Sequence, residues 1–260
     1  MISSAVKDQL RVMIDAARDA LLNDPALDDR DGEDLVTTGV QRTFAGLRNT
    51  GLVVATPCSP SRPMTQETYD AVSRGLAFDH GVLPISIQSF EVTNNREKLV
   101  EAAIRSGFRK LLFLDADTVC DWKGVAQLLE TMRQQGAALV AALVFQRYIG
   151  NEGIFNAFVE TGEEEPKHAA LTRKDMPTTL TAFPVAYCGL ACALIDLDQV
   201  KTVEAPWFKR VAHGNRHYGE DVHFCLRLRE HDLGVFVDPK VATVHCVPHR
   251  FQYEPMIVQE

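Results

Sequence analysis

Residues 109–118 read RKLLFLDADT, and this stretch decides the fold. Four apolar residues in succession, 111–114, are typical of a strand that is buried on both faces. Such strands belong to mostly parallel sheets that helices cover on both sides. Two carboxylates, Asp115 and Asp117, follow where the strand ends. Because a desolvated carboxylate is costly without a compensating charge, this position favours a nearby cation.

Apolar runs of the same kind lie on both sides of this stretch. They predict further strands at 51–56, 83–90 and 137–145. Segments with helical spacing of apolar residues separate them, so strand and helix alternate along the chain. This alternation predicts an α/β fold with a mostly parallel sheet flanked by helices. Ligands of such sheets bind beyond the carboxyl ends of the strands.

Helix boundaries follow from residues that cap or end helices. Within the region from residue 51 onward, Thr65 and Asn95 are expected to cap the first two helices, and Gly107 is expected to end the second. A third helix is expected from Trp122 to Gly136. The apolar positions of the first helix predict the side that faces the core: Tyr69, Val72 and Leu76.

Three ranges describe the expected domain organisation. Residues 1–50 read as an N-terminal helical extension, with a helix at 4–22 followed by an acidic loop. Residues 51–260 form the main domain. Within it, residues 146–183 lose the apolar pattern and are expected to be a mobile loop or insertion over the site.

The composition is that of an ordinary globular protein. The 260 residues are 46% hydrophobic and 24% charged, with a formal net charge of −8. An acidic balance argues against broad nucleic-acid binding, which favours basic proteins. No secretory signal or apolar run of membrane-spanning length is visible, so the sequence predicts a soluble, cytoplasmic protein.

Six cysteines occur, and none forms a C-x-x-C pair. We expect reduced, mostly buried thiols. A zinc site is the alternative, with four ligands drawn from late in the chain: Cys188, Cys192, Cys225 and His245.

Asp115 and Asp117 offer the oxygen ligands that a hard divalent cation prefers, and such a cation can also bind phosphate oxygens. The alternative is a capped loop with two solvated acids. Further along, Gly219-Glu220-Asp221 precedes a helical pattern. An acid there stays ionised in the helix dipole and suits a general base, although plain capping of the helix by Asp221 is the commoner explanation of this motif alone.

His245 lies in an apolar strand pattern near the C-terminus, within VDPKVATVHC. A histidine in such a place is either a metal ligand or a core residue with a satisfied hydrogen bond.

Taken in order, these segments resemble the GT-A glycosyltransferases, family 2 in particular. The resemblance covers roughly residues 51–250, and Asn94-Asn95-Arg96 is similar to the segment that such enzymes place against the nucleotide. Its motifs match, in chain order, Thr56-Pro57, Asp115-Ala116-Asp117, Cys188-Gly189-Leu190, Gly219-Glu220-Asp221 and His245.

The resemblance implies a GT-A, Rossmann-like fold and a metal-dependent hexosyl- or pentosyltransferase. Mn²⁺ or Mg²⁺ would bind Asp117 and His245, with Asp115 as a further ligand or as a contact to the ribose or a metal-bound water. Asp221, helped by Glu220, would deprotonate the acceptor hydroxyl in an inverting transfer. A UDP- or GDP-sugar donor would contact nine residues: Thr56, Pro57, Glu91, Asn95, Arg96, Asp115, Ala116, Asp117 and Gly189.

Gly189 is expected to let the backbone approach donor or acceptor, because it lacks a side chain. Trp207 and His217 are expected on the acceptor side, where an aromatic ring either stacks on a sugar or simply packs. Four arginines are candidates to assist at the phosphates: Arg62, Arg96, Arg147 and Arg216.

Some features depart from the family pattern. About 50 residues precede the first strand, and Thr-Pro-Cys-Ser, residues 56–59, replaces the usual Pro-Thr-Tyr-Asn. The Q-x-x-R-W motif of processive synthases is missing, which favours a single transfer.

Other functions stay open. LLFLDADT also fits the first motif of haloacid-dehalogenase phosphohydrolases, where Asp115 would be the nucleophile and Asp117 the acid/base. That family places the motif on its first strand, whereas two strands precede it here. A non-catalytic nucleotide- or glycan-binding module and a nucleotidyltransferase are further alternatives. The acceptor is open among saccharide, protein, lipid-linked glycan and a hydroxymethylated DNA base.

Overall fold

The computed structural model describes residues 51–61, 63–78, 80–146, 153–161, 168–176, 180–213, 216–246 and 251–253. The expected extension 1–50, with its helix at 4–22, lies outside the described residues, and so do Arg62 and Arg147. No helix within the described residues is long and apolar enough to cross a membrane.

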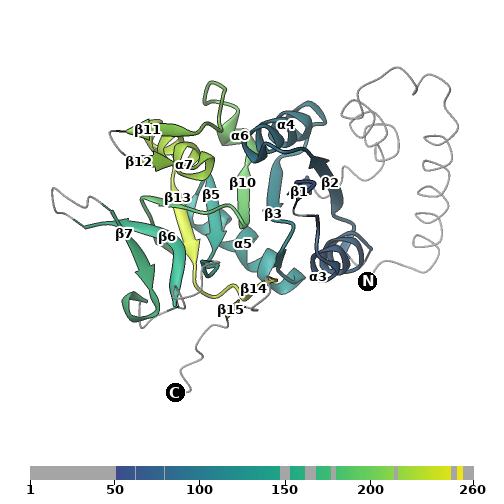
Figure 1. The fold of residues 1–260 in the computed structure, drawn as a ribbon, viewed down its shortest axis with the longest axis horizontal. Helices are drawn as coiled ribbons and strands as arrows, with labels where there is room; N and C mark the ends of the chain where they lie inside the picture. The colour runs from purple at the N-terminus through teal and green to yellow at the C-terminus, as the bar shows by residue number, and fades with distance from the viewer. Residues whose placement is uncertain are drawn as a thin grey trace, which may run out of the picture.

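A seven-stranded sheet forms the centre of the molecule, with the strand order β2-β1-β3-β10-β5-β13-β8. Figure 1 labels its strands from β2 to β13. In that order the strands span Leu83–Gln88, Leu52–Cys58, Lys110–Leu114, Cys192–Asp196, Leu139–Ala142, Val235–Asp238 and Phe183–Pro184. β1 is parallel to β2 and β3, and β5 is parallel to β13.

Two strands of this sheet run against the others. β10 is antiparallel to both its neighbours, β3 and β5, and β8 is antiparallel to β13. The remaining strands share one direction, so their carboxyl ends meet at one edge. The α/β class with a mostly parallel sheet is confirmed, and this is the architecture that the GT-A resemblance implies.

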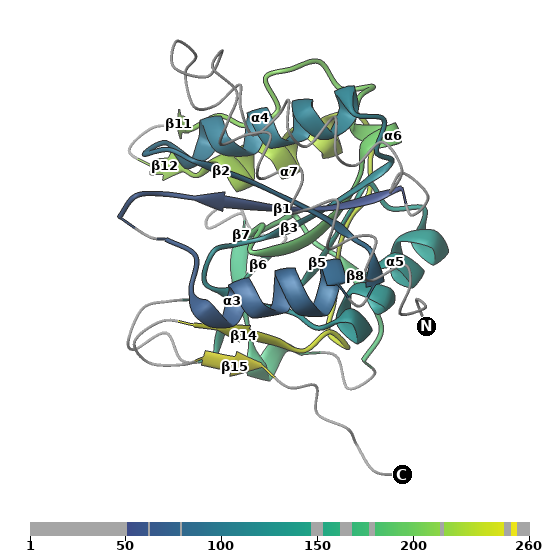
Figure 2. The same ribbon diagram turned by 90° about the vertical axis from the view of Figure 1, so that its right-hand side faces the viewer.

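Helices cover both faces of the sheet, as Figure 2 shows. α4 (Val92–Arg105) and α7 (Glu220–Glu230) pack on one face. The π-helical η3 (Ala71–Phe78), which continues α3 (Gln66–Asp70), packs on the other face with α5 (Trp122–Gln135). The short α6 (Leu197–Val200) follows β10.

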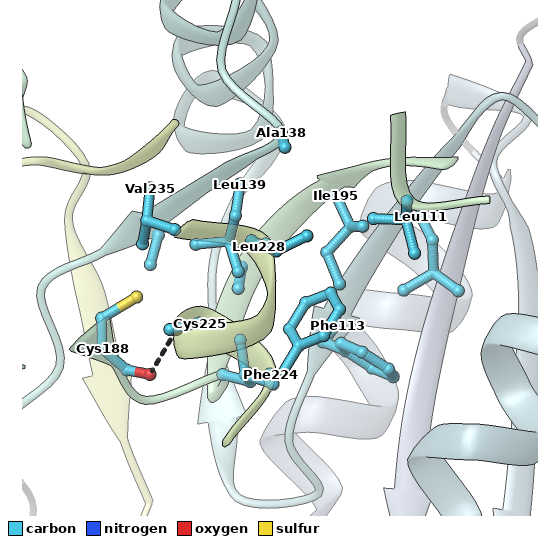
Figure 3. Close-up of a cluster of buried hydrophobic side chains, with 14 of the residues drawn as sticks. Leu111, Phe113, Ala138, Leu139, Cys188, Ile195, Phe224, Cys225, Leu228 and Val235 are labelled. Atoms are coloured by element: carbon cyan, nitrogen blue, oxygen red, sulfur yellow. Dashed lines mark hydrogen bonds between the residues drawn. The ribbon is translucent and has the colours of Figure 1, made fainter. Parts of the chain in front are cut away.

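β3 is buried on both faces, as its run of apolar residues predicts. Leu111 and Phe113 pack toward α4 and α7, whereas Leu112 and Leu114 pack toward η3 and α5, and all four are fully buried. Figure 3 shows the first side, where Leu111 and Phe113 lie in one cluster with the α7 side chain of Phe224. A shift of one residue would bury the flanking charges, so the register of β3 is strongly specified.

The expected helix boundaries are mostly confirmed. The Thr65 side chain accepts a hydrogen bond from the backbone N–H of Thr68 and so caps α3. α4 ends just before Gly107, whose φ is 79°, and α5 ends at Gly136, whose φ is 61°. Glycine takes these left-handed conformations without the strain of a side chain.

Two local expectations are wrong. Asn95 does not cap α4, because the helix begins at Val92 with Glu91 at the N-cap position. Tyr69 does not face the core, since it is 56% exposed. Val72 and Leu76 of η3 are buried as expected, and the buried residue of α3 is Thr68 instead of Tyr69.

Three small sheets flank the central one. One has the order β7-β6-β9, a second β15-β14-β4, and the third is the pair β11-β12. In the first sheet the strands are β7 (His168–Thr172), β6 (Ile154–Glu160) and β9 (Tyr187–Cys188). In the second they are β15 (Phe251–Tyr253), β14 (Thr243–His245) and β4 (Thr118–Val119). The third consists of β11 (Val211–His213) and β12 (Arg216–Tyr218).

The segment 146–183 contains regular structure that its sequence pattern did not indicate. β6 and β7 pair with each other, β6 also pairs with β9, and the 3-10 turn η4 (Arg173–Asp175) follows β7. Phe155 and Ala157 of β6 alternate into the core. Two such residues in one strand are too short an alternation to stand out in the sequence.

Candidate active site at the carboxyl edge of the sheet

Asp115-Ala116-Asp117 turns sharply at the carboxyl end of β3. The backbone N–H of Asp115 donates to the carbonyl of Ala191 at 2.8 Å, and the N–H of Thr118 donates back to the carbonyl of Asp115 at 2.9 Å. Thr65, at the start of α3, donates its N–H to the carbonyl of Ala116 at 2.7 Å. The backbone of the motif is therefore held from three sides, and the two carboxylates are left to other partners.

The pairing of two short strands brings His245 to this turn. β14 pairs antiparallel with β4, and the register sets His245 opposite Thr118. The N–H of Cys246 donates to the carbonyl of Asp117 at 2.6 Å. Nε2 of His245 consequently lies 3.5 Å from Oδ1 of Asp117.

The other ring nitrogen of His245 indicates the tautomer. Nδ1 lies 3.0 Å from the carbonyl oxygen of Phe145, and a carbonyl oxygen only accepts hydrogen bonds. Nδ1 therefore carries a proton, and in the neutral ring Nε2 keeps its lone pair on the side of Asp117. A histidine that binds a metal commonly donates its second N–H to a backbone carbonyl in this way.

Asp117 and His245 thus fit a divalent cation as a pair of ligands. Two ligands about 2.1 Å from one ion and at right angles lie about 3 Å apart, close to the separation found here. Among the described residues, no three His, Cys, Asp or Glu side chains gather as a complete metal site. Mg²⁺ often takes one or two protein ligands, with phosphate oxygens and waters in the remaining positions.

The zinc alternative is wrong for the same reason. Cys188, Cys192, Cys225 and His245 do not form a group that could hold a metal. The thiol of Cys225 instead lies 3.6 Å from the carbonyl of Cys188. All six cysteines are free thiols, as expected from the sequence.

Arg96 lies between Asp115 and Glu220 and is almost completely buried. Its Nη2 donates to Oδ1 of Asp115 at 2.8 Å, and its Nε donates to Oε1 of Glu220 at 3.3 Å. Burial lowers the pKa of Arg96, but the charges of Asp115, Glu220 and Asp221 raise it above its ordinary value overall. Arg96 therefore binds two acids of the protein, and its expected contact to the nucleoside or the phosphates stays a prediction.

The first turn of α7 carries the second pair of acids. Gly219 is the N-cap and provides no side-chain cap, so Asp221 is not the capping residue. The Asp221 carboxylate accepts a hydrogen bond from the N–H of Val222 at 2.8 Å. A side chain at position 219 would meet Oδ1 of Asp221 at 2.6 Å, so Gly219 leaves the room that this carboxylate occupies.

The two acids of this turn differ in their electrostatics. Glu220 is paired with Arg96. Burial chiefly, together with the charges of Glu220 and Asp115, raises the pKa of Asp221 to about 6, although the Val222 N–H and the charge of Arg96 lower it. A carboxylate with a pKa near the working pH is well suited to act as a general base. Asp221 is thus the better candidate of the two.

The residues expected at the donor's nucleoside lie around the end of β1. Thr56 and Pro57 belong to β1 itself, where both are buried. Asn95 is also buried: its amide donates to the carbonyl of Cys58 at 2.8 Å, and its oxygen accepts from Ser89 at 2.6 Å. The Asn95 side chain thus connects α4 to β1, so we assign Asn95 a structural role beside the site.

Glu91 is exposed at the same rim, where its carboxylate lies 3.6 Å from Nη2 of Arg210. Ala116 is buried within the motif turn and contributes its backbone carbonyl, as described above. The positions of Glu91 and Ala116 are thus compatible with a ligand at this edge.

Gly189 leaves room for a side chain of β6. A Cβ at this position would collide with the side chain of Asn156, and the Gly189 N–H donates to the Asn156 carbonyl at 2.7 Å. The glycine therefore gives room to Asn156 of β6, and its expected approach to the donor or acceptor stays a prediction.

Trp207 packs instead of facing outward. It is 8% exposed, and its indole N–H donates to the carbonyl of Val203 at 2.8 Å. The carboxylate of Glu97 accepts the backbone N–H groups of Trp207 and Phe208 at 3.2 and 2.9 Å. The side chains of Arg216 and His217 lie outside the described residues.

The comparisons with known proteins concern the fold. No protein-family model matches the sequence, and a search of curated proteins gives no match. Among solved structures, A197 from STIV is similar with a TM-score of 0.55 and 16% identity, over 78% of this chain and 90% of that chain. The likeness shows the fold alone.

A second solved structure is that of GalNAc-T7 with UDP, GalNAc and Mn²⁺. Its TM-score is 0.42 at 11% identity, over 74% of this chain and 43% of that chain. A likeness this low supports no inference about the present protein, so the function has to be inferred from the site itself.

Sequence reasoning missed two residues of the site's frame. Glu97 lies one residue after Arg96 and holds the segment around Trp207, while Asn156 fills the space at Gly189. Glu97 stands in the run of three charges Arg96-Glu97-Lys98 of α4, and that run gave no signal that singles out Glu97. Asn156 gave none, because its strand was not expected.

Proposed function

We propose that this protein is a metal-dependent glycosyltransferase, which moves one sugar from a nucleotide-diphosphate sugar to an acceptor hydroxyl. The observation that carries the proposal is the pairing of Asp117 with the lone-pair side of His245, at the same edge of the sheet as Asp221. A cation-binding pair and a base of suitable pKa are the two elements that such a transfer needs.

Asp117 and His245 would hold Mn²⁺ or Mg²⁺, with Asp115 alongside. When bound, the ion neutralises the charge that develops on the departing diphosphate. The protein has a net charge of −8, and the nearest buried cation, Arg96, is already engaged by two acids. Arg96 is therefore not available for that task, and a bound metal ion would perform it.

Asp221 performs the proton transfer in this proposal. The acceptor hydroxyl gives its proton to the Asp221 carboxylate, and the hydroxyl oxygen forms a bond to the anomeric carbon of the sugar. The bond from that carbon to the diphosphate oxygen breaks, and the nucleoside diphosphate leaves with its electron pair. Attack opposite to the leaving group inverts the anomeric configuration.

The phosphohydrolase alternative is disfavoured by the surroundings of Asp115. A nucleophilic carboxylate must approach phosphorus, but Oδ1 of Asp115 accepts a hydrogen bond from Arg96 at 2.8 Å. An ion-paired carboxylate is a weaker nucleophile, because its negative charge is already compensated. The motif also stands on the third strand of the described chain rather than on the first.

A panel of UDP- and GDP-sugars tests the proposal, with released nucleotide measured in Mn²⁺ or Mg²⁺ and again with EDTA. We expect release from at least one donor, loss of it with EDTA, and recovery on adding metal. Phosphate release from an aryl phosphate, abolished by Asp115→Asn, would instead establish the phosphohydrolase. Donor binding without release, with every acceptor class supplied, would support the non-catalytic module.

A further inference from the structure

The guanidinium of Arg96 joins parts of the chain that are far apart in sequence. It comes from α4 and reaches Asp115, 19 residues away at the end of β3, and Glu220, 124 residues away at the start of α7. The Arg96 side chain is 4% exposed, and those of Asp115 and Glu220 are 17% and 12% exposed. Both ion pairs are thus largely shielded from water. Charges attract each other more strongly in such a shielded environment than at the protein surface.

Two further contacts fix the orientation of this guanidinium. Nη1 lies 3.5 Å from the carbonyl oxygen of Leu190, and the guanidinium carbon lies 4.9 Å from the centre of the Phe113 ring. The ring belongs to β3, two residues before Asp115. Arg96 is therefore held by side chains at β3 and at the start of α7, and by the backbone of Leu190 between β9 and β10.

Three carboxylates act on this one cation: Asp115 and Glu220 form ion pairs with it, and the charge of Asp221 also raises its pKa. The negative charges of these carboxylates repel one another, so their arrangement depends on the positive charge of Arg96. Arg96 makes its hydrogen bonds to Asp115 and Glu220, while Asp221 accepts from the backbone of Val222. Arg96 is thus ion-paired with Asp115 and Glu220, whereas Asp221 is the carboxylate that is not ion-paired with it.

We propose that Arg96 is a positioning residue, which ties the metal side of the site at Asp115 to the base side at α7 and sets the separation between them. This inference rests on the proposed function. Arg96 itself touches neither donor nor acceptor. Its planar guanidinium donates in two directions at once, whereas the ammonium of a lysine is a single point charge that would pair fully with one acid only.

The test compares the wild type with Arg96→Lys, and uses Arg109→Lys as the matched control. Arg109 makes one ion pair, with Asp198 at 2.7 Å, and is exposed just before β3, away from the site. We expect kcat to fall about 100-fold in Arg96→Lys, the size of effect that a displacement of about 1 Å can have. The KM for the donor should stay within about threefold, and the control should match the wild type.

Hydrogen exchange supplies a readout that does not depend on activity. The N–H of His223 bonds to the carbonyl of Gly219 in the first turn of α7. In Arg96→Lys we expect exchange at this turn to be about tenfold faster, with exchange in β10 unchanged. If the wild type releases nucleotide from no donor, the proposed function fails, and this exchange rate alone decides whether Arg96 ties α7 to β3.

Several outcomes overturn the inference. An unchanged kcat in an active enzyme does so, as does a rise in KM alone, which would mean that Arg96 contacts the donor. Unchanged exchange at the first turn of α7 does so in either case. If Arg96→Lys does not fold, Glu220→Gln weakens the same connection from the other end, and the same loosening of α7 is expected of it.

Discussion

Replacing Asp221 with asparagine should make the protein more stable at neutral pH. The folded structure raises the pKa of Asp221 from its ordinary 3.8 to about 6, chiefly through burial. The folded protein thus binds this proton more tightly than the unfolded chain. The resulting stabilisation is complete below about pH 4 and is lost as the pH rises through 6, where the buried carboxylate becomes charged.

The size of the effect follows from the shift in pKa. A shift of about 2 units corresponds to roughly 3 kcal/mol between the protonated and the charged carboxyl group. The amide of an asparagine carries no charge at any pH, so the variant escapes this penalty. We therefore expect Asp221→Asn to raise the free energy of unfolding by up to about 3 kcal/mol at pH 7.5, and by almost nothing at pH 4.

Urea denaturation of the wild type and Asp221→Asn at pH 4, 5.5 and 7.5 measures this difference. Asp198→Asn is the matched control, because the hydrogen bonds from Lys201 and Arg109 lower the pKa of Asp198 to about 2. That substitution should destabilise slightly at pH 7.5, which is the opposite sign. If Asp221→Asn is no more stable than the wild type at pH 7.5, Asp221 is not a buried, disfavoured carboxylate and its suitability as a base loses its basis.

Two further predictions concern the rate and the packing of the site. The kcat/KM for transfer should fall tenfold per pH unit below about pH 6, because Asp221 must be ionised to accept a proton; a flat profile between pH 4.5 and 7 would assign the base elsewhere. Gly189→Ala should lower the free energy of unfolding by about 1–3 kcal/mol through its collision with Asn156. Gly75→Ala is the control for packing, because a Cβ there meets no atom within 4 Å, and thermal unfolding of both variants should separate the two cases.

Local pattern was sufficient to predict the centre of the fold. The apolar run at 111–114 is buried on both faces, so its burial follows directly from composition. The acids that follow it had to lie at the carboxyl edge once the sheet was parallel. The edge of the sheet and its two carboxylates were therefore accessible from the sequence.

Contacts between residues far apart in the chain could be predicted only where the residues belonged to a recognised motif. The pairing of β4 with β14 joins strands of two and three residues that lie far apart in the chain, and strands this short have no periodicity to detect. The partner of His245 was predicted from motif order rather than from any local signal. The double ion pair of Arg96 depends on where α4 and α7 pack, which the sequence alone does not specify.

The central claim is most directly tested by nucleotide release from the best sugar donor, measured in Mn²⁺ for the wild type, Asp117→Asn and His245→Gln. The account predicts that release requires metal, and that each variant loses at least about 100-fold in kcat/KM, a loss of about 2.7 kcal/mol in transition-state stabilisation. Release that persists in EDTA, or that proceeds equally in all three proteins, would contradict it.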